Sequence, residues 1–243
     1  MYKDLADLET SPKTSKYPAD GRSFERNTTP WIGDLKFKDI SGPDGKPDGV
    51  IDDYDKTNIG SPMPKFTFGW TNTFKYKNFD LNIFVNGTYG NKVFNYMKMQ
   101  LTHMNSLWTN QLSDVTKRAK LEPIDPTKTY ATGSYWYNDV TNVRVANPET
   151  NIPRATLADP NDNDVISDRY IEDGSYISLK NIALGYTFPK KVISKWGVTN
   201  LRVYMNIQNL LTITGYSGYD PEIGASTADI NGYSYGVDNG RYP

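Results

Sequence analysis

The stretches SDRYIEDGSYISLKNIALGYTFP (residues 167–189) and NLRVYMNIQNLLTITGYSGYDPEIG (residues 200–224) decide the fold of this chain. In each, apolar and polar residues alternate with a period of two, which predicts a β-strand with one apolar and one polar face. A short basic connection joins the two strands, so we predict an antiparallel hairpin over residues 169–212. Strands of this length, rich in Tyr and Asn, are typical of a transmembrane β-barrel.

A second hairpin is predicted over residues 64–90. Its first arm places Phe66, Phe68 and Trp70 on one face and threonines on the other, and its second arm alternates in the same way. The polar pair Lys77–Asn78 between the arms is short enough for a tight turn.

The remaining segments are predicted to be loops. Residues 91–168 begin with a spacing that favours a short helix and then lose any regular period. Long connections alternating with short ones are typical of a transmembrane barrel, whose outer loops are long and whose inner turns are short. The predicted loops are residues 1–32 (polar), 33–60 (acidic), 91–168 (with Met97, Leu101, Met104, Leu107 and Leu112 along one side of the helix) and 213–243.

Composition excludes several classes of protein. A formal net charge of −1 gives no support for a nucleic-acid partner, and the absence of cysteine excludes disulfides and thiolate metal sites. No apolar run approaches the ~20 residues of a membrane helix. Residues 1–14 lack an apolar leader, so we expect any export signal to lie outside this sequence.

Periodicity alone leaves two all-β folds open. One is an open, partial barrel sheet whose apolar face meets lipid, and the other is a soluble β-sandwich whose apolar face is buried. Aromatic residues near the predicted strand ends resemble the interfacial girdles of a membrane barrel. These residues are Tyr76, Phe79, Tyr89, Tyr186, Phe188 and Trp196.

The chain resembles the C-terminal part of SusC/RagA-type TonB-dependent outer-membrane transporters. Six pieces match in family order, and the resemblance covers residues 33–243. They are GDLKFKDISGPDGKPDGVIDDYDKTNIGSPMPKFTFG (33–69), FDLNIFVNGTYGNKVFN (79–95), NPETNIPRA (147–155), SDRYIEDGSYISLKNIALGYTFP (167–189), LRVYMNIQNLLTITGYSGYDPE (201–222) and YGVDNGRYP (235–243).

The resemblance implies a nutrient importer in the outer membrane of a Gram-negative bacterium. Such proteins have a plug domain, contact TonB and close a barrel of about 22 strands. Their outer loops meet a SusD-like surface lipoprotein, and they carry glycans, oligosaccharides or peptides. Against that pattern the chain is expected to be an internal fragment, without the plug and the last strand, that is inactive alone.

The acidic loop is the candidate metal site. Its spacing is similar to that of an EF-hand loop, in which oxygen ligands from a tight turn bind Ca²⁺. Lys46 stands at one usual ligand position, and the alternative is a solvated turn that caps a strand. The candidate ligands are Asp44, Asp48, Val50, Asp52 and Asp55.

Catalysis is not expected. His103 is the only histidine, and the adjacent Glu172 and Asp173 would point to opposite faces of a strand, which argues against a shared glycosidase site. We expect ligand or partner contacts from aromatic loop residues, whose flat faces suit sugars and protein interfaces. These are Trp108, Tyr135, Trp136 and Tyr137.

Three functional hypotheses follow. The leading one is a segment of a TonB-dependent importer in the outer membrane. The second is a soluble β-sandwich that binds carbohydrate and holds a structural calcium ion in the Asp44–Asp55 loop. The third, a glycan-processing enzyme, requires paired carboxylates that the predicted strand geometry does not supply.

Overall fold

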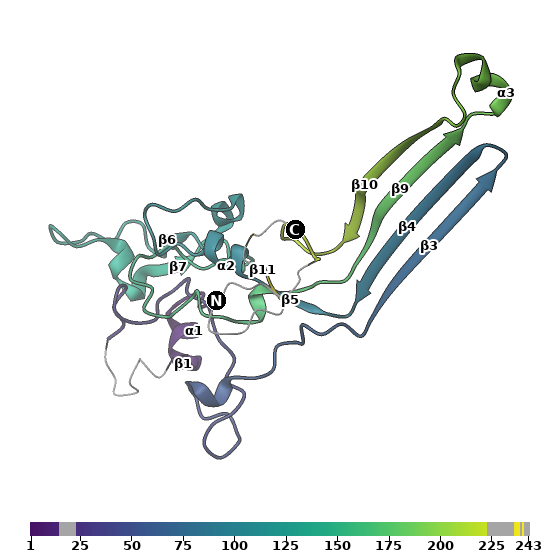
Figure 1. Cartoon of the computed structure of the whole chain (residues 1–243). Coiled ribbons are helices and arrows are strands. Elements are labelled where there is room, and N and C mark those ends of the chain that lie inside the picture. Colours follow the sequence, from purple (N-terminus) through teal and green to yellow (C-terminus); the bar gives the residue numbers. More distant parts are fainter. Residues whose placement is uncertain (15–22, 223–235, 239, 241–243) are drawn as a thin grey trace. The chain divides into compact units, whose positions relative to one another are not determined.

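A computed structural model describes residues 1–14, 23–222, 236–238 and 240 of the chain. The chain forms two compact units (Figure 1). The first, here called the loop unit, comprises Met1–Asn58 and Lys98–Ile166, and the second, the sheet unit, comprises Ile59–Met97 and Ser167–Pro243. Strands and antiparallel pairing dominate and helices are few, which confirms the predicted all-β class.

The sheet unit is built on four long antiparallel strands in the order β10-β9-β4-β3 (Figure 1). Both predicted hairpins are confirmed, and β9 pairs with β4 to join them into one sheet. The strands are β3 (Phe66–Tyr76), β4 (Phe79–Tyr89), β9 (Tyr176–Thr187) and β10 (Arg202–Thr214).

Both short connections lie at the same end of this sheet. Lys77–Asn78 joins β3 to β4, with Lys77 in the left-handed region at φ 53°. Residues 188–201 join β9 to β10 through α3 (Lys190–Ile193) and η6 (Ser194–Trp196). The Thr187 N–H donates to the Asn78 carbonyl at 2.9 Å, which ties the two connections together. The longer connections start from the opposite end of the four-stranded sheet, as the sequence predicts.

A smaller sheet follows in the order β11-β5-β8. Its strands are β5 (Lys92–Asn95), β8 (Ile171–Asp173) and β11 (Val237–Asp238). The predicted loop 91–168 therefore begins with a strand. The strand β5 forms because it pairs with β8 and β11, which lie far along the chain, and no local period in the sequence indicates it.

The predicted helix is shorter than its apolar spacing indicated. The helix α2 spans Tyr96–Thr102, and the extension of its apolar side to Met104, Leu107 and Leu112 is wrong. The Thr102 hydroxyl donates back to the Lys98 carbonyl at 2.7 Å, a bond that competes with helix continuation. The Leu112 N–H then donates to the Leu101 carbonyl at 2.9 Å, so the chain has reversed direction.

The loop unit contains only short elements. None of the helices in the described ranges is long and apolar enough to cross a membrane. The remaining elements are α1 (Leu5–Thr10), β1 (Lys13–Thr14), β2 (Val50–Ile51), η1 (Asp53–Asp55), η2 (Ser113–Lys117), β6 (Leu121–Pro123), η3 (Trp136–Asn138), η4 (Val140–Asn142), β7 (Val143–Val145) and, in the sheet unit, η5 (Asp168–Tyr170).

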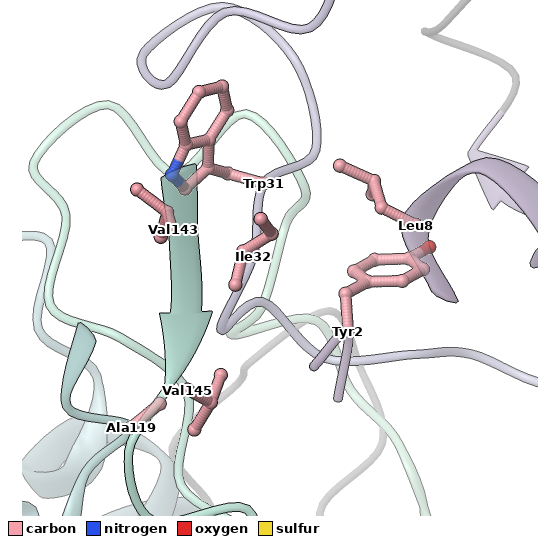
Figure 2. Packing of buried hydrophobic residues seen from close by; sticks show 7 residues of the cluster. All are labelled: Tyr2, Leu8, Trp31, Ile32, Ala119, Val143 and Val145. Atoms are coloured by element: carbon pink, nitrogen blue, oxygen red, sulfur yellow. The ribbon is translucent and has the colours of Figure 1, made fainter. Parts of the chain in front are cut away.

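A small apolar core holds the loop unit together (Figure 2). Residues 1–32, predicted to be a polar loop, supply Tyr2, Leu8, Trp31 and Ile32 to it, so that interpretation was wrong for these positions. They are isolated apolar residues in a polar segment, and no period marks them as buried. The partners from the other half of the unit are Ala119, Val143 and Val145.

A buried ion pair joins the two halves of the loop unit. Arg154 donates from Nε to Asp34 Oδ1 at 2.7 Å, and their side chains are 2% and 0% exposed. Asp34 also accepts from the Trp31 N–H at 2.8 Å and from Asn163 Nδ2 at 3.0 Å. A buried charge is tolerated when it is paired and hydrogen-bonded in this way.

We predict that Asp34→Asn destabilises the loop unit by about 3–5 kcal/mol, because it leaves the Arg154 guanidinium buried without a counter-charge. Urea unfolding monitored by circular dichroism measures the loss. Glu122→Gln is the matched control, since Glu122 pairs with Arg144 on the surface at 2.8 Å and should contribute about 1 kcal/mol or less. Equal losses in the two variants would contradict the role given to Asp34.

Candidate functional site

The four-stranded sheet has one almost continuously apolar face. Residues paired directly across antiparallel strands share a face, and the register aligns the apolar positions of all four strands. Only Asn72 and Gly87 interrupt the set. Its members are Phe66, Phe68, Trp70, Phe74 and Tyr76 from β3; Phe79, Leu81, Ile83, Val85 and Tyr89 from β4; Ile177, Leu179, Ile182, Leu184 and Tyr186 from β9; and Val203, Met205, Ile207, Leu211 and Ile213 from β10.

Two irregularities preserve this alignment. The register of β9 against β10 shifts between Gln208 and Leu211, and Asn209 there has a φ of 49°. The register of β4 against β9 shifts between Phe84 and Val85. Without such bulges one extra residue would move every later side chain to the other face.

No second layer covers the apolar face in the described part of the chain. Trp70 is 50% exposed, Met205 59% and Ile213 63%. A sandwich would bury these side chains against a second sheet, so the β-sandwich alternative is wrong for the described residues. A patch of this extent marks a surface that meets a partner or a membrane.

Aromatic side chains gather at both ends of the same sheet. At the end with the short connections, the Phe79 and Tyr186 ring centroids are 4.6 Å apart, and Tyr186 lies 4.9 Å from Phe188. At the other end, Phe66 and Tyr89 are 5.4 Å apart. Of the predicted strand-end aromatics, Phe79, Tyr186 and Phe188 therefore cluster at one end of the strands, and Tyr89 contacts Phe66 at the other.

The opposite face is polar and internally bonded. Arg202 on β10 donates from Nη2 to Asp80 Oδ2 on β4 at 2.6 Å, and this pair passes over Gly185 of the intervening β9. A Cβ at Gly185 would lie 2.7 Å from Asp80 Oδ1 and would also meet the Arg202 guanidinium. Glycine is therefore required for the ion pair to cross the strand.

We predict that Gly185→Val separates Asp80 from Arg202. A double-mutant cycle with Asp80→Asn and Arg202→Gln should give a small favourable coupling energy in the native background. The coupling should vanish in the Gly185→Val background, as measured by urea unfolding in detergent micelles. It should persist with Ala183→Val, the control on the same strand and face. Coupling that survives Gly185→Val would contradict this geometry.

The acidic loop is organised by hydrogen bonds from its own backbone. Asp55 Oδ1 accepts from the N–H groups of Ile40 at 2.7 Å and Ser41 at 3.1 Å, while its Oδ2 accepts from the Asp52 N–H at 2.9 Å. Burial opposes ionisation of Asp55, but these three donors outweigh it and lower the pKa of its carboxyl. Asp39 accepts from the Gly49 N–H at 2.6 Å.

The five predicted calcium ligands do not converge in the described structure. Asp48 accepts from the Val50 N–H at 2.9 Å, Asp52 from the Tyr54 N–H at 2.8 Å, and Asp44 is exposed. Within the described ranges, no three or more His, Cys, Asp or Glu side chains are grouped to hold a metal ion. The observed bonds are those of the capped turn that was the alternative, and calcium binding stays a prediction.

We predict that Asp55→Ala accelerates hydrogen exchange of the Ile40, Ser41 and Asp52 amides by about tenfold, because each loses a charged acceptor. The control is Asp53→Ala, whose exposed carboxylate pairs only with Lys56 at 2.7 Å among the described residues and should leave these amides unchanged. Unchanged exchange in Asp55→Ala would be the contrary result. If added calcium slowed the exchange of these three amides in the unsubstituted chain, that result would support the metal hypothesis instead.

The four predicted ligand aromatics have different surroundings. Trp136 is half-buried and packs against the core of the loop unit. Tyr135 and Tyr137 stack with centroids 5.1 Å apart and planes 5° apart, and the Arg26 guanidinium lies 5.0 Å from the Tyr137 ring. Trp108 is 95% exposed. The structure does not bring all four together.

The residues considered for catalysis are engaged elsewhere. Glu172 accepts from the N–H and hydroxyl of Ser217 at 2.9 and 2.8 Å, whereas Asp173 accepts from the Ser175 N–H at 2.9 Å and pairs with Lys92. His103 is the exception, because only its backbone N–H is bonded, to the Met99 carbonyl, and its buried Nδ1 has no hydrogen-bond partner among the described residues. These carboxylates serve as backbone and ion-pair acceptors.

Sequence reasoning missed a cleft of about 730 Å³ in the loop unit. Segments around residues 26, 104–118 and 155–158 line it, and Arg26 and Arg118 supply its charge. The sequence gives no signal for it, because the lining positions come from three separate segments without a shared motif.

Curated relatives of this chain are named as TonB-dependent receptors. The TonB-dependent receptor P3 of Formosa agariphila is 32% identical over 231 residues, which are 92% of this chain and 19% of that protein. SusC of Bacteroides thetaiotaomicron, also a TonB-dependent receptor, is 27% identical over 187 residues, 76% of this chain and 15% of that protein. The chain is a relative of SusC-type TonB-dependent receptors. No family model matches it.

The fold comparison agrees with this relationship. The RagAB peptide importer in its closed-closed state superposes with a TM-score of 0.52 at 20% identity, over 83% of this chain and 19% of that one. The resemblance to SusC/RagA-type proteins predicted from the sequence is confirmed. The chain spans about a fifth or less of the length of these TonB-dependent receptors, which are named as receptors and not as enzymes.

Proposed function

We propose that the chain forms part of the barrel wall of a TonB-dependent importer in the outer membrane of a Gram-negative bacterium. The observation that carries this proposal is the uncovered apolar face of the four-stranded sheet, bounded at both ends by aromatic side chains. Transmembrane barrels present an apolar band of this kind to lipid, with aromatic girdles at the two interfaces.

Strand length supports the same proposal. The four strands have 11, 11, 12 and 13 residues, and a tilted transmembrane strand needs about 9–11. In this function the polar face, with its Asp80–Arg202 pair, lines the barrel interior. The free edges of β3 and β10 pair with neighbouring strands of the wall, because unpaired backbone is not tolerated in lipid.

The position of the connections sets the proposed orientation. The short connections at Lys77–Asn78 and residues 188–201 lie on the inner side, and the long segments lie outside the cell. In the whole importer these outer segments meet a SusD-like lipoprotein, and energy comes from TonB. The substrate is a glycan, an oligosaccharide or a peptide, and the chain has no enzymatic role.

Adjacent residues on β10 provide a direct test of the lipid-facing side. Because the chain has no native cysteine, Ile207→Cys and Asn206→Cys each give a single labelling site. The two side chains lie on opposite faces, so a spin label at position 207 should be accessible to oxygen and shielded from a water-soluble nickel relaxant. A label at position 206 should show the reverse in the whole importer reconstituted in phospholipid vesicles, where neighbouring strands pair with the edges of β3 and β10. Two labels that are equally accessible to nickel would refute the proposal.

A further inference from the structure

The cleft of the loop unit is a feature that the barrel-wall function leaves unused. At about 730 Å³ it falls within the size range of small-molecule sites, about 300–1,000 Å³. Its lining comes entirely from the loop unit and combines two arginines with neutral polar and aliphatic side chains.

The cleft carries two positive charges without a counter-charge. Arg26 and Arg118 line it, no acidic residue does, and neither guanidinium has a carboxylate within 4.0 Å among the described residues. By contrast, Arg144, Arg154 and Arg202 each pair with a carboxylate. Two arginines that lack carboxylate partners in a concave surface favour an anionic ligand.

Arg26 also has a buried hydrogen-bond donor without an acceptor. Its Nε is buried and has no hydrogen-bond partner in the described part of the chain. Burial, and then repulsion by Arg154, lower the pKa of the Arg26 guanidinium. A buried donor without an acceptor costs free energy, which a bound carboxylate would recover.

The other lining residues indicate what kind of molecule carries the anionic group. Met104, Leu107, Val115 and Leu157 contribute aliphatic surface, and Leu107 and Leu157 are 68% and 59% exposed. No aromatic residue lines the cleft, and the Tyr137 ring stacks on Tyr135 and on the Arg26 guanidinium, which lies 5.0 Å from it. Asn27, Ser106, Thr109, Gln111 and Thr156 supply amide and hydroxyl groups that can bond a peptide backbone. With the two guanidinium groups and the aliphatic side chains, they suit a peptide that has acidic and aliphatic residues.

We propose that this cleft binds a short acidic peptide, whose carboxylates pair with Arg26 and Arg118. The peptide is the cargo of the proposed importer, so its biological role rests on that function. Bidentate pairing between guanidinium and carboxylate would fix the orientation of the peptide, and the aliphatic lining would hold its side chains.

Fluorescence anisotropy with a labelled hexapeptide of alternating leucine and glutamate tests the proposal on the chain in detergent micelles. Arg26→Gln and Arg118→Gln should each weaken binding about tenfold or more, the effect of losing a charged hydrogen bond. Arg118 is exposed, so its replacement leaves folding intact. Arg144→Gln removes the same charge outside the cleft and should leave the affinity unchanged.

Three outcomes would overturn the proposal. They are an unchanged affinity in Arg118→Gln, equal binding of a leucine–glutamine hexapeptide, and tighter binding of an oligogalacturonate. The labelling test at positions 206 and 207 is independent of all three. Peptide binding can therefore fail while the barrel-wall function stands, and a failed labelling test would remove the import role and leave the cleft as a peptide site.

Discussion

The register of one four-stranded sheet is the constraint on which the rest of this structure depends. Each strand alternates apolar and polar residues, but the face becomes continuous only because cross-strand pairing aligns the four patterns. The bulge at Asn209 absorbs the irregular spacing of Leu210 and Leu211 in β10. The same register places Gly185 between Asp80 and Arg202, which allows an ion pair to cross a strand on the polar face.

The loop unit is stabilised by different means. It has few regular elements, and its apolar core consists of a small number of side chains from distant segments. The Asp34–Arg154 pair adds specificity, because a buried guanidinium has few alternative partners and fixes which segments meet. Asn163 extends this network by donating to both Asp34 and Asp159. A unit of long connections can thus hold a defined shape with little secondary structure.

The two candidate ligand sites differ in whether their charged groups already have hydrogen-bond or ion-pair partners. The carboxylates of the acidic loop accept hydrogen bonds from nearby backbone amides, so their charge already stabilises a turn. The guanidinium groups of Arg26 and Arg118 have no such carboxylate partners in the described structure, although both line a concave surface. An arginine without a carboxylate partner in a cleft indicates ligand binding more strongly than carboxylates that already accept hydrogen bonds, as Asp48, Asp52 and Asp55 do.

By itself the sequence determined the four long strands, the tight turn at Lys77–Asn78 and the difference between short and long connections. These depend on local alternation and turn chemistry, which a single segment contains. Only the tertiary structure decided that the apolar face is uncovered, that Tyr2 and Trp31 are core residues, that α2 ends at Thr102 and that Arg26 and Arg118 share a cleft. The core and the cleft join segments about a hundred positions apart, so no local pattern encodes them.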